Sequence, residues 1–427
     1  MKVLVVGAGG REHALSWKIS QSTLVTSVFV APGNGGTELE DHLTNVDIQA
    51  DDIEGLASFA LEQGIDLTIV GPEDPLVNGI TDRFNDLGLK CFGPSKGAAQ
   101  LEGSKEFMKD FLQRHHIPTA EYSSFSDTER AIEYVEQKGC PIVIKADGLA
   151  AGKGVTIAHT VEEAKEAIYQ SLESKVFGEA GKKIVIEEFL DGEEASFIVM
   201  TDGTNVIPFA SSQDHKALED NDKGPNTGGM GAYSPAPIVD EYVHEKIMNE
   251  IIFPTLKGLR KDGYKYCGFL YAGMMIDKNK KLKVLEFNCR FGDPETQPIM
   301  MRLKSDLASL CDQACDDNLI EQPLEWDSRK AIGVVLAARG YPHGYAKGKD
   351  ITNIPSETDD LKIFHAGTKI ESNSLKSNGG RVLCVTSLGD SVESAQNKAY
   401  DAVSEIEWED AFYRKDIGYR AIARERK

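Results

Sequence analysis

Positive charge is scarce in this sequence. Lysine and arginine number 47 against 68 aspartates and glutamates, which gives a formal net charge of −21 and an isoelectric point near 4.9. A surface this acidic repels polyanions, so we expect no binding to nucleic acid or to an anionic membrane through bulk charge. A phosphorylated small molecule could still bind at a local basic site or on backbone N–H groups.

Long apolar runs and paired cysteines are also missing. No stretch approaches the roughly 18 apolar residues that span a bilayer, and the N-terminal MKVLVVGAGGREH lacks the layout of a signal peptide. The seven cysteines form no C-x-x-C pair, and no histidine lies near Cys311 and Cys315 to complete a zinc site. We expect the cysteines to be free thiols in the reducing cytoplasm. We also expect the protein to be a monomer.

A third absence is the P-loop. The stretch IVIKADGLAAGKGVTIA (142–158) contains Gly-Lys, but G-x-x-x-x-G-K-[ST] also needs a glycine at 147 and a hydroxyl at 154. The residues there are Asp147 and Gly154, so any metal ligands must lie elsewhere. We interpret the stretch as a glycine-rich tip that lies against phosphate, with Lys153 making only a transient contact.

Residues 1–104 alternate short apolar runs with helical patterns. The runs KVLVV, SVFVAPG and DLTIVGPEDP each end in a glycine or proline loop. This alternation predicts a parallel sheet with helices on its faces. Ligands gather at the carboxyl ends of such strands, so the loops 7–10, 31–36 and 71–75 should lie along one rim.

The rest of the chain has mixed patterns. We predict a helix that ends before Pro118, a loop too irregular for regular structure at 221–237, and a solvated basic helix at 413–425. A hairpin is predicted over 268–291, with its turn at 277–281. The remaining predicted helices are 127–138, 161–173 and 391–406, and the remaining strands are 141–146, 154–158, 183–189, 331–338, 361–370 and 380–388.

The stretch VVGAGGREH joins a strand to a helix through glycines. Backbone N–H groups and the helix dipole then point at an anion. It is not the dinucleotide fingerprint, because Glu12 stands where G-x-G-x-x-G has its last glycine. A phosphate site, tight strand–helix packing and a cofactor site remain open as interpretations.

The stretch KVLEFNCRFGDPE is more specific. In a strand, Glu286, Asn288 and Arg290 share one face, while the apolar residues between them occupy the other. Carboxylate and amide oxygens suit Mg²⁺ carrying a nucleotide, and an arginine beside them suits a carboxylate or a phosphate. The alternative is an exposed polar strand face. Taken alone, the stretch IVIEEFLDGEEASF is compatible with any hairpin that has an acidic edge. Lys105 and Lys145 are each compatible with a solvated surface lysine.

Taken in order, these stretches resemble the ATP-grasp superfamily and, within it, the phosphoribosylamine–glycine ligase family. The resemblance covers residue 1 to about 420 and includes GGREHAL, APGNGGT, VGPEDPLV, FGPSKGAAQLEGSK, KADGLAAGKGV, EEFLDGEEASF, QDHK, GPNTGGMGAYSPAP, EFNCRFGDPETQ and GGRVLCVT. It implies a multidomain α/β and α+β fold. The expected parts are a parallel Rossmann-like (pre-ATP-grasp) domain at 1–104, an ATP-grasp fold in two parts at 105–190 and 191–325, and a small mixed α/β domain at 326–427. A mobile lid of about 122–190 belongs to the first ATP-grasp part, and the metal site belongs to the second.

The resemblance also implies roles for single residues. Contacts to ATP are expected from Lys105, Lys145, Glu187, Glu188, Leu190 and Glu193, and Mg²⁺ (or Mn²⁺) would be held by Glu286 and Asn288. Contacts to the other substrates are expected from Gly9, Gly10, Asn34, Glu73, Asp214, Lys216, Gly229 and Arg290. Catalytic roles fall to Lys145, Asp214 and Arg290, with Asp214 on the amino group of glycine and Arg290 on its carboxylate.

The implied reaction activates glycine with ATP to an acyl phosphate, which the amine of 5-phosphoribosylamine then attacks. A lid that excludes water suits an intermediate that hydrolyses quickly. One departure is that the strand before the metal strand, GFLYAGMMID, is apolar until Asp277, which puts a second metal site in doubt. The alternatives are a dinucleotide-dependent oxidoreductase, a non-catalytic nucleotide-binding regulator, and an ATP-grasp ligase for another amine.

Overall fold

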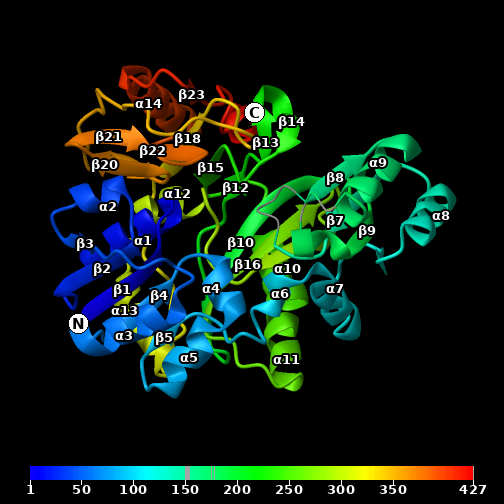
Figure 1. Ribbon diagram of the computed structural model, residues 1–427, viewed down its shortest axis with the longest axis horizontal. Coiled ribbons are helices and arrows are strands. Elements are labelled where there is room, and N and C mark those ends of the chain that lie inside the picture. The colour runs from blue at the N-terminus through cyan, green and yellow to red at the C-terminus, as the bar shows by residue number, and fades with distance from the viewer. Residues whose placement is uncertain (150–153, 175, 177, 427) are drawn as a thin grey trace.

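The computed structural model describes residues 1–149, 154–174, 176 and 178–426. Figure 1 shows three regions: the N-terminal sheet, the C-terminal unit beside it, and a small outlying sheet with two helices on the other side. The tip at 150–153, with Lys153, lies outside the described residues. No helix in the described ranges is long and apolar enough to cross a membrane.

The N-terminal sheet is parallel throughout, in the order β3-β2-β1-β4-β5. Because β2, β1 and β4 are neighbours and point the same way, the loops that follow them share one edge, as predicted. The strands are β1 (Lys2–Gly7), β2 (Ser27–Pro32), β3 (Leu43–Asn45), β4 (Leu67–Val70) and β5 (Cys91–Phe92). The helices are α1 (Gly10–Ser20), α2 (Gly35–Leu39), α3 (Ile53–Gln63), α4 (Glu73–Asn78) and α5 (Ile80–Asp86).

Two antiparallel sheets follow, one small and one larger, with the orders β6-β9-β7-β8 and β11-β10-β16-β17. The helices α8 and α9 pack on the small sheet, where Ala131, Ile144 and Ile168 are buried together. The small unit contains β6 (Tyr122–Phe125), α8 (Thr128–Lys138), β7 (Ile142–Ala146), β8 (Val155–Ala158), α9 (Val161–Leu172) and β9 (Ile184–Glu188). The larger sheet contains β10 (Glu193–Thr201), β11 (Val206–Pro208), β16 (Gly268–Ile276) and β17 (Leu282–Asn288). Helices α6 (Gln100–Gly103), α7 (Lys105–Arg114), α10 (Glu241–Ile247), α11 (Phe253–Lys261), α12 (Thr296–Arg302) and α13 (Leu307–Cys315) complete this part.

The C-terminal sheet has the order β12-β15-β18-β22-β19, with β23 also paired to β18. Two of its strands come from the middle of the chain, so its core is assembled from distant segments. The strands are β12 (Gln213–Asp214), β15 (Gly231–Ser234), β18 (Lys330–Ala338), β19 (Leu361–His365), β22 (Arg381–Gly389) and β23 (Ala411–Phe412), and helix α14 (Val392–Glu405) packs on them.

Two predictions about this region were wrong. The single strand predicted at 361–370 is two strands, β19 and β20 (Thr368–Glu371). The chain turns at Gly367, where a side chain would come within 2.4 Å of Gly379 Cα. The loop at 221–237 is not irregular throughout, because β14 (Lys223–Asn226) pairs with β13 (Ala217–Glu219) and β15 joins the C-terminal sheet. Short strands rich in glycine carry too little periodicity to be found from sequence.

The basic C-terminal segment is not simply solvated, which corrects a further prediction. Arg414 is fully buried and forms ion pairs with Asp222 at 3.0 Å and Asp416 at 2.8 Å. The closing helix α15 (Tyr419–Glu425) places Arg424 2.5 Å from Glu193. The C-terminal segment therefore contacts the 220–222 turn and the start of β10 and holds both in place. It does not face only water.

Candidate active site

A cavity of about 470 Å³ lies between the small sheet and the larger sheet, and residues of the N-terminal and C-terminal units close one end of it. Of the residues predicted to bind ligands, the structure brings eleven to its wall: Glu73, Lys105, Lys145, Glu187, Glu188, Leu190, Asp214, Lys216, Glu286, Asn288 and Arg290. These residues are up to 217 positions apart in the chain, as Glu73 and Arg290 are. The predicted constellation is thus gathered in one place.

Lysines dominate the end of the cavity next to the small sheet. Lys145, on β7, donates to the Leu285 carbonyl at 3.2 Å, and its Nζ lies 2.9 Å from Glu187 Oε1. Lys105, at the start of α7, donates to the Gly148 carbonyl at 3.3 Å, and burial lowers its pKa. Two lysines whose ammonium groups donate to backbone carbonyls at the cavity wall are suited to phosphate.

The carboxylate of Glu187 is ion-paired with two lysines. Besides Lys145 it contacts Lys109, whose Nζ lies 2.8 Å from Oε2 and donates to Thr119 Oγ1 at 2.7 Å. Lys109 is fully buried, and burial lowers its pKa to about 8, although Glu187 opposes that change. Because its carboxylate serves these two lysines, Glu187 can offer a ligand mainly its backbone. Glu188 is ion-paired with Lys283 at the rim.

The strand predicted to carry the metal donors is β17, which ends at Asn288, so Arg290 lies just beyond the strand and not in it as predicted. Glu286 and Asn288 are on β17 and line the cavity. Lys216 Nζ lies 3.1 Å from Glu286 Oε1 and also pairs with Glu194. The charge of Lys216 holds the pKa of Glu286 down at about 2. A carboxylate that is ionised at neutral pH, next to an amide oxygen, is a pair of oxygen donors that suits a hard cation such as Mg²⁺.

No acidic side chain of β16 faces this position, in agreement with the sequence. Asp277 accepts the N–H groups of Asn279 and Lys281 at 2.8 Å each and so closes the β16–β17 turn. In the described ranges no group of three or more His, Cys, Asp and Glu side chains is arranged to hold a metal ion. Glu286 and Asn288 are the donors that the sequence predicted, and such a pair suits a metal that arrives with a nucleotide.

Arginines and carboxylates alternate at the end of the cavity toward the N-terminal unit. Arg290 pairs with Glu73 at 3.2 Å and with Glu102 at 2.8 Å, while Arg11 lies 3.9 Å from Glu73. Burial would raise the pKa of Glu73, but Arg290 and Arg11 bring it to about 2. Two guanidinium groups therefore line this end of the cavity, each already paired with carboxylates of the protein.

Asp214 is the unusual group of the cavity. Its side chain is half-buried, and its Oδ1 is shielded from solvent and has no hydrogen-bond partner among the described residues. Burial, and then the nearby Glu295, raise the pKa of this carboxyl well above its usual value. Glu295 accepts a hydrogen bond from Ser196 Oγ at 2.8 Å. A carboxylate oxygen that is shielded from water and lacks a hydrogen-bond donor costs stability unless a donor arrives, so the site suits an ammonium group.

The glycine turn after β1 is already filled. The Glu12 carboxylate accepts the N–H of Gly9 at 2.6 Å, and a side chain on Gly7, Gly9 or Gly71 would collide with Glu12. A side chain on Gly10 would come within 2.6 Å of Gln297, so this glycine allows close helix packing. Glu12 thus occupies the space that a pyrophosphate would need, which argues against a dinucleotide site.

Five of the residues predicted to bind ligands lie outside the cavity wall: Gly9, Gly10, Asn34, Glu193 and Gly229. Asn34 donates at 2.9 Å to the Ala8 and His365 carbonyls and accepts two N–H groups at the start of α2. Glu193 is paired with Arg424, and its neighbour Glu194 faces the cavity instead. Gly229 lies directly behind the wall, next to Asp214. Their ligand roles stay predictions.

Sequence reasoning missed several residues of the wall. They are Arg11, Glu102, Glu194, Glu295, Tyr341 and Arg381. Arg381 lies in the GGRVLCVT stretch, where Gly-Gly-Arg precedes an apolar strand. The sequence did not show which residues this arginine contacts. The others carried no local pattern, because their importance depends on what the fold sets beside them.

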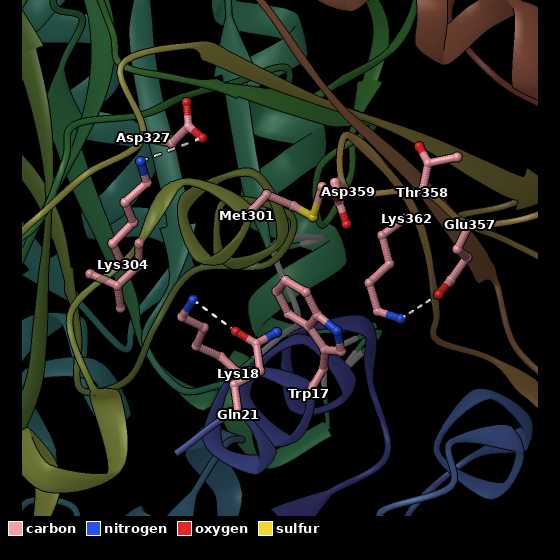
Figure 2. A pocket seen from close by; sticks show the side chains of 11 residues that line it. Trp17, Lys18, Gln21, Met301, Lys304, Asp327, Glu357, Thr358, Asp359 and Lys362 are labelled. Carbon is pink, nitrogen blue, oxygen red and sulfur yellow. Dashed lines mark hydrogen bonds and ion pairs between the residues drawn. The ribbon is translucent and has the colours of Figure 1, made fainter. Parts of the chain in front are cut away.

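A second cavity, of about 540 Å³, lies at the seam of α1, the end of α12 and the loop before β19 (Figure 2). It shares no lining residue with the first. Its buried lysine, Lys362, is ion-paired with Glu40 and Glu357 at 2.6 Å each, and Lys18 donates to Gln21 at 3.0 Å. None of the residues predicted to bind ligands lies here.

Comparison with known proteins gives a consistent result. Three family models match: phosphoribosylglycinamide synthetase N domain (residues 1–102), ATP-grasp (A) domain (103–296) and C domain (331–420). The chain is 61% identical to phosphoribosylamine–glycine ligase of Escherichia coli (strain K12), and 60% identical to that of Vibrio vulnificus (strain CMCP6), over the full length of each chain.

Solved structures agree. The crystal structure of phosphoribosylamine–glycine ligase from Thermotoga maritima superposes with a TM-score of 0.86 at 34% identity, covering 98% of this chain and all of that one. The biotin carboxylase domain of Hydrogenobacter thermophilus 2-oxoglutarate carboxylase, solved with MgADP and bicarbonate, superposes with a TM-score of 0.74 at 17% identity. It covers 96% of this chain and 91% of that one, and at this identity it shows the shared fold alone.

Proposed function

The chain belongs to the phosphoribosylglycinamide synthetase family, and from this premise we propose that it joins glycine to 5-phosphoribosylamine. The reaction uses ATP, proceeds through glycyl phosphate, and gives glycinamide ribonucleotide, ADP and phosphate in purine biosynthesis. The single observation that carries the proposal is that one cavity wall brings together the lysines Lys105 and Lys145, the oxygen donors Glu286 and Asn288, and Asp214, whose Oδ1 has no hydrogen-bond partner among the described residues.

At the nucleotide end, Lys105 and Lys145 contact the phosphates, and the backbone of Glu187 to Leu190 borders the adenine. Glu193 holds the ribose if Arg424 releases it. Glu286 and Asn288 would hold Mg²⁺, or Mn²⁺ in its place, and such a metal would offset the charge that develops when phosphate moves between two anions. Lys216, whose Nζ lies 3.1 Å from Glu286 Oε1, is a further cation beside these donors.

At the other end, Asp214 accepts the ammonium of glycine. Burial raises the pKa of the Asp214 carboxyl, and an ammonium group beside it would lower this pKa again and so favour the carboxylate. Arg290 binds the glycine carboxylate and holds it toward the lysines, which is catalysis by orientation. Glu73, Asn34, Gly9, Gly10 and Gly229 border the phosphoribosylamine.

The test is an ADP-release assay with each component omitted in turn. We expect ADP only when glycine, 5-phosphoribosylamine and Mg²⁺ are all present. Turnover that ignores glycine but responds to another acid, or a preference for a different amine, would contradict the substrate assignment.

We further propose a cytoplasmic monomer, for which light scattering should give a mass of 46.7 kDa. The division at residues 104, 190 and 325 remains part of this proposal, and limited proteolysis tests it.

A further inference from the structure

Arg381, at the start of β22 in the C-terminal unit, reaches across to the cavity wall. Its Nη1 donates to the carbonyls of Gly228 and Asp293 at 2.6 Å each and to the Gly229 carbonyl at 3.3 Å. Its Nη2 lies 3.2 Å from Asp293 Oδ2. One guanidinium group therefore fixes the 228–229 turn to the segment that follows the metal strand.

Tyr341 holds the same turn from its other side. Its hydroxyl oxygen accepts the Gly228 N–H at 3.0 Å, and its ring packs on Gly380, the residue before Arg381. A side chain on Gly228 would meet Arg381 Cζ at 3.1 Å and the Tyr341 hydroxyl at 3.2 Å. Both the carbonyl and the N–H of Gly228 are thus bound by residues more than 110 positions away in the chain.

This turn lies directly beside Asp214. Gly229 has φ +112°, a conformation that favours glycine, and a side chain there would approach Pro294 Cδ to 2.4 Å and Asp214 Oδ1 to 2.7 Å. The atom nearest to it on Asp214 is Oδ1, which has no hydrogen-bond partner among the described residues. The space around this oxygen is therefore walled by a glycine backbone whose position the C-terminal unit sets.

We propose that Arg381 and Tyr341 are positioning residues that hold the Gly228–Gly229 turn against Asp214. By doing so they restrict the amino-acid subsite to a substrate without a side chain. The inference rests on the proposed function, since it takes Asp214 to hold the amino group of glycine. Hydrogen bonds from a charged guanidinium to carbonyls are among the stronger ones. The backbone of Gly228 and Gly229 therefore moves little to make room for an added methyl group.

The experiment compares Arg381→Met and Tyr341→Phe with the wild-type chain in the ADP-release assay. Glycine, L-alanine and D-alanine serve in turn as the amino acid, because either hydrogen of glycine could face the wall. We expect the ratio of kcat/KM for the better alanine enantiomer to that for glycine to rise about tenfold, the scale of discrimination by one methyl group. The KM for glycine should rise while the KM for ATP stays the same. Arg381→Lys should bring the alanine-to-glycine ratio part of the way back to the wild-type value, since a lysine supplies the charge without the planar fork of a guanidinium group.

The matched controls are Tyr345→Phe, on the neighbouring ring 6.4 Å away, and Arg339→Met, on an exposed arginine of the same unit. Neither should change the alanine-to-glycine ratio. If Arg381→Met does not fold, Tyr341→Phe, which removes one oxygen atom, decides the question. An unchanged ratio in Tyr341→Phe and in any folded Arg381 variant, or an equal rise in the KM for ATP, overturns the inference. Wild-type chain that releases no ADP in response to glycine would instead overturn the proposed function.

Discussion

The buried Lys109–Glu187–Lys145 group allows the sharpest test of how charge is balanced in the ATP-grasp core. Glu187→Gln keeps the shape of the side chain and removes its charge. The variant leaves Lys109, which is fully buried, with only the Thr119 hydroxyl and an amide as partners. Removing one partner of a buried ion pair costs about 3–5 kcal/mol, because the remaining charge has lost its compensation.

This cost converts to a shift in melting temperature. The ATP-grasp region spans residues 103–296. At about 2.1 cal/mol/K per residue its unfolding entropy is about 0.4 kcal/mol/K, so Glu187→Gln should lower the Tm of this region by about 7–12 °C. Differential scanning calorimetry at pH 7 measures the shift. Glu121→Gln is the matched control, because Glu121 pairs with Lys138 on the surface of the same region, with side chains 65% and 43% exposed. An exposed pair contributes less than about 1 kcal/mol, so the control should shift Tm by no more than about 2–3 °C.

The pH dependence checks the mechanism independently. Burial would raise the pKa of Glu187, but Lys145 and Lys109 hold it below its usual value of 4.5. A carboxylate with a lowered folded-state pKa contributes stability above pH 4.5 and loses it as the pH falls through the folded value. The difference in Tm between wild type and Glu187→Gln should therefore be full at pH 7 and shrink below about pH 4.5. A Tm loss no larger than that of Glu121→Gln, or one that does not depend on pH, would refute this reasoning.

Three further predictions follow from the site. Glu286→Ala should abolish turnover and weaken Mn²⁺ binding in the presence of an ATP analogue, with an unchanged circular dichroism spectrum; full activity would remove the metal strand from the proposal. Gly229→Ala should lower kcat/KM for glycine at least about tenfold, because its methyl group would enter the space of Asp214 Oδ1, and steady-state kinetics with glycine and ATP varied separately checks this. Asn34→Ala should destabilise the chain by about 1–3 kcal/mol in urea unfolding, since it removes a helix cap and leaves the His365 carbonyl without its donor; a change only in KM would instead favour the predicted substrate contact.

Much of the fold was predictable because its signals are local. Alternating apolar runs and helical patterns identified the parallel N-terminal sheet, and period-two alternation placed Glu286 and Asn288 on one face of β17. The failed P-loop match was informative for the same reason, since the spacing of a few residues decides it. The predictions that failed were also local, as at 361–370, where the turn at Gly367 depends on the approach of Gly379.

The site was only partly predictable. GAGG was correctly interpreted as a strand–helix turn, but the sequence could not show that Glu12 fills it. Glu187 was predicted at the adenine hinge, yet its side chain serves Lys109 and Lys145. In both cases the residue type suggests a ligand, and a neighbouring side chain satisfies the group instead.

By itself the sequence determined the class of the protein, the order of most of its elements and eleven of the residues that line the cavity. Side-chain periodicity could predict the elements because it is a property of short stretches, and the resemblance to the family supplied the cavity residues. Only the tertiary structure decided which charges are shared within the protein and which are left for a ligand. Lys109 and Arg414 look like surface residues and are fully buried, whereas Asp214 lacks a hydrogen bond at Oδ1 among the described residues. That division depends on burial and on contacts such as Arg381 with Gly228, 153 positions apart, which no local pattern contains.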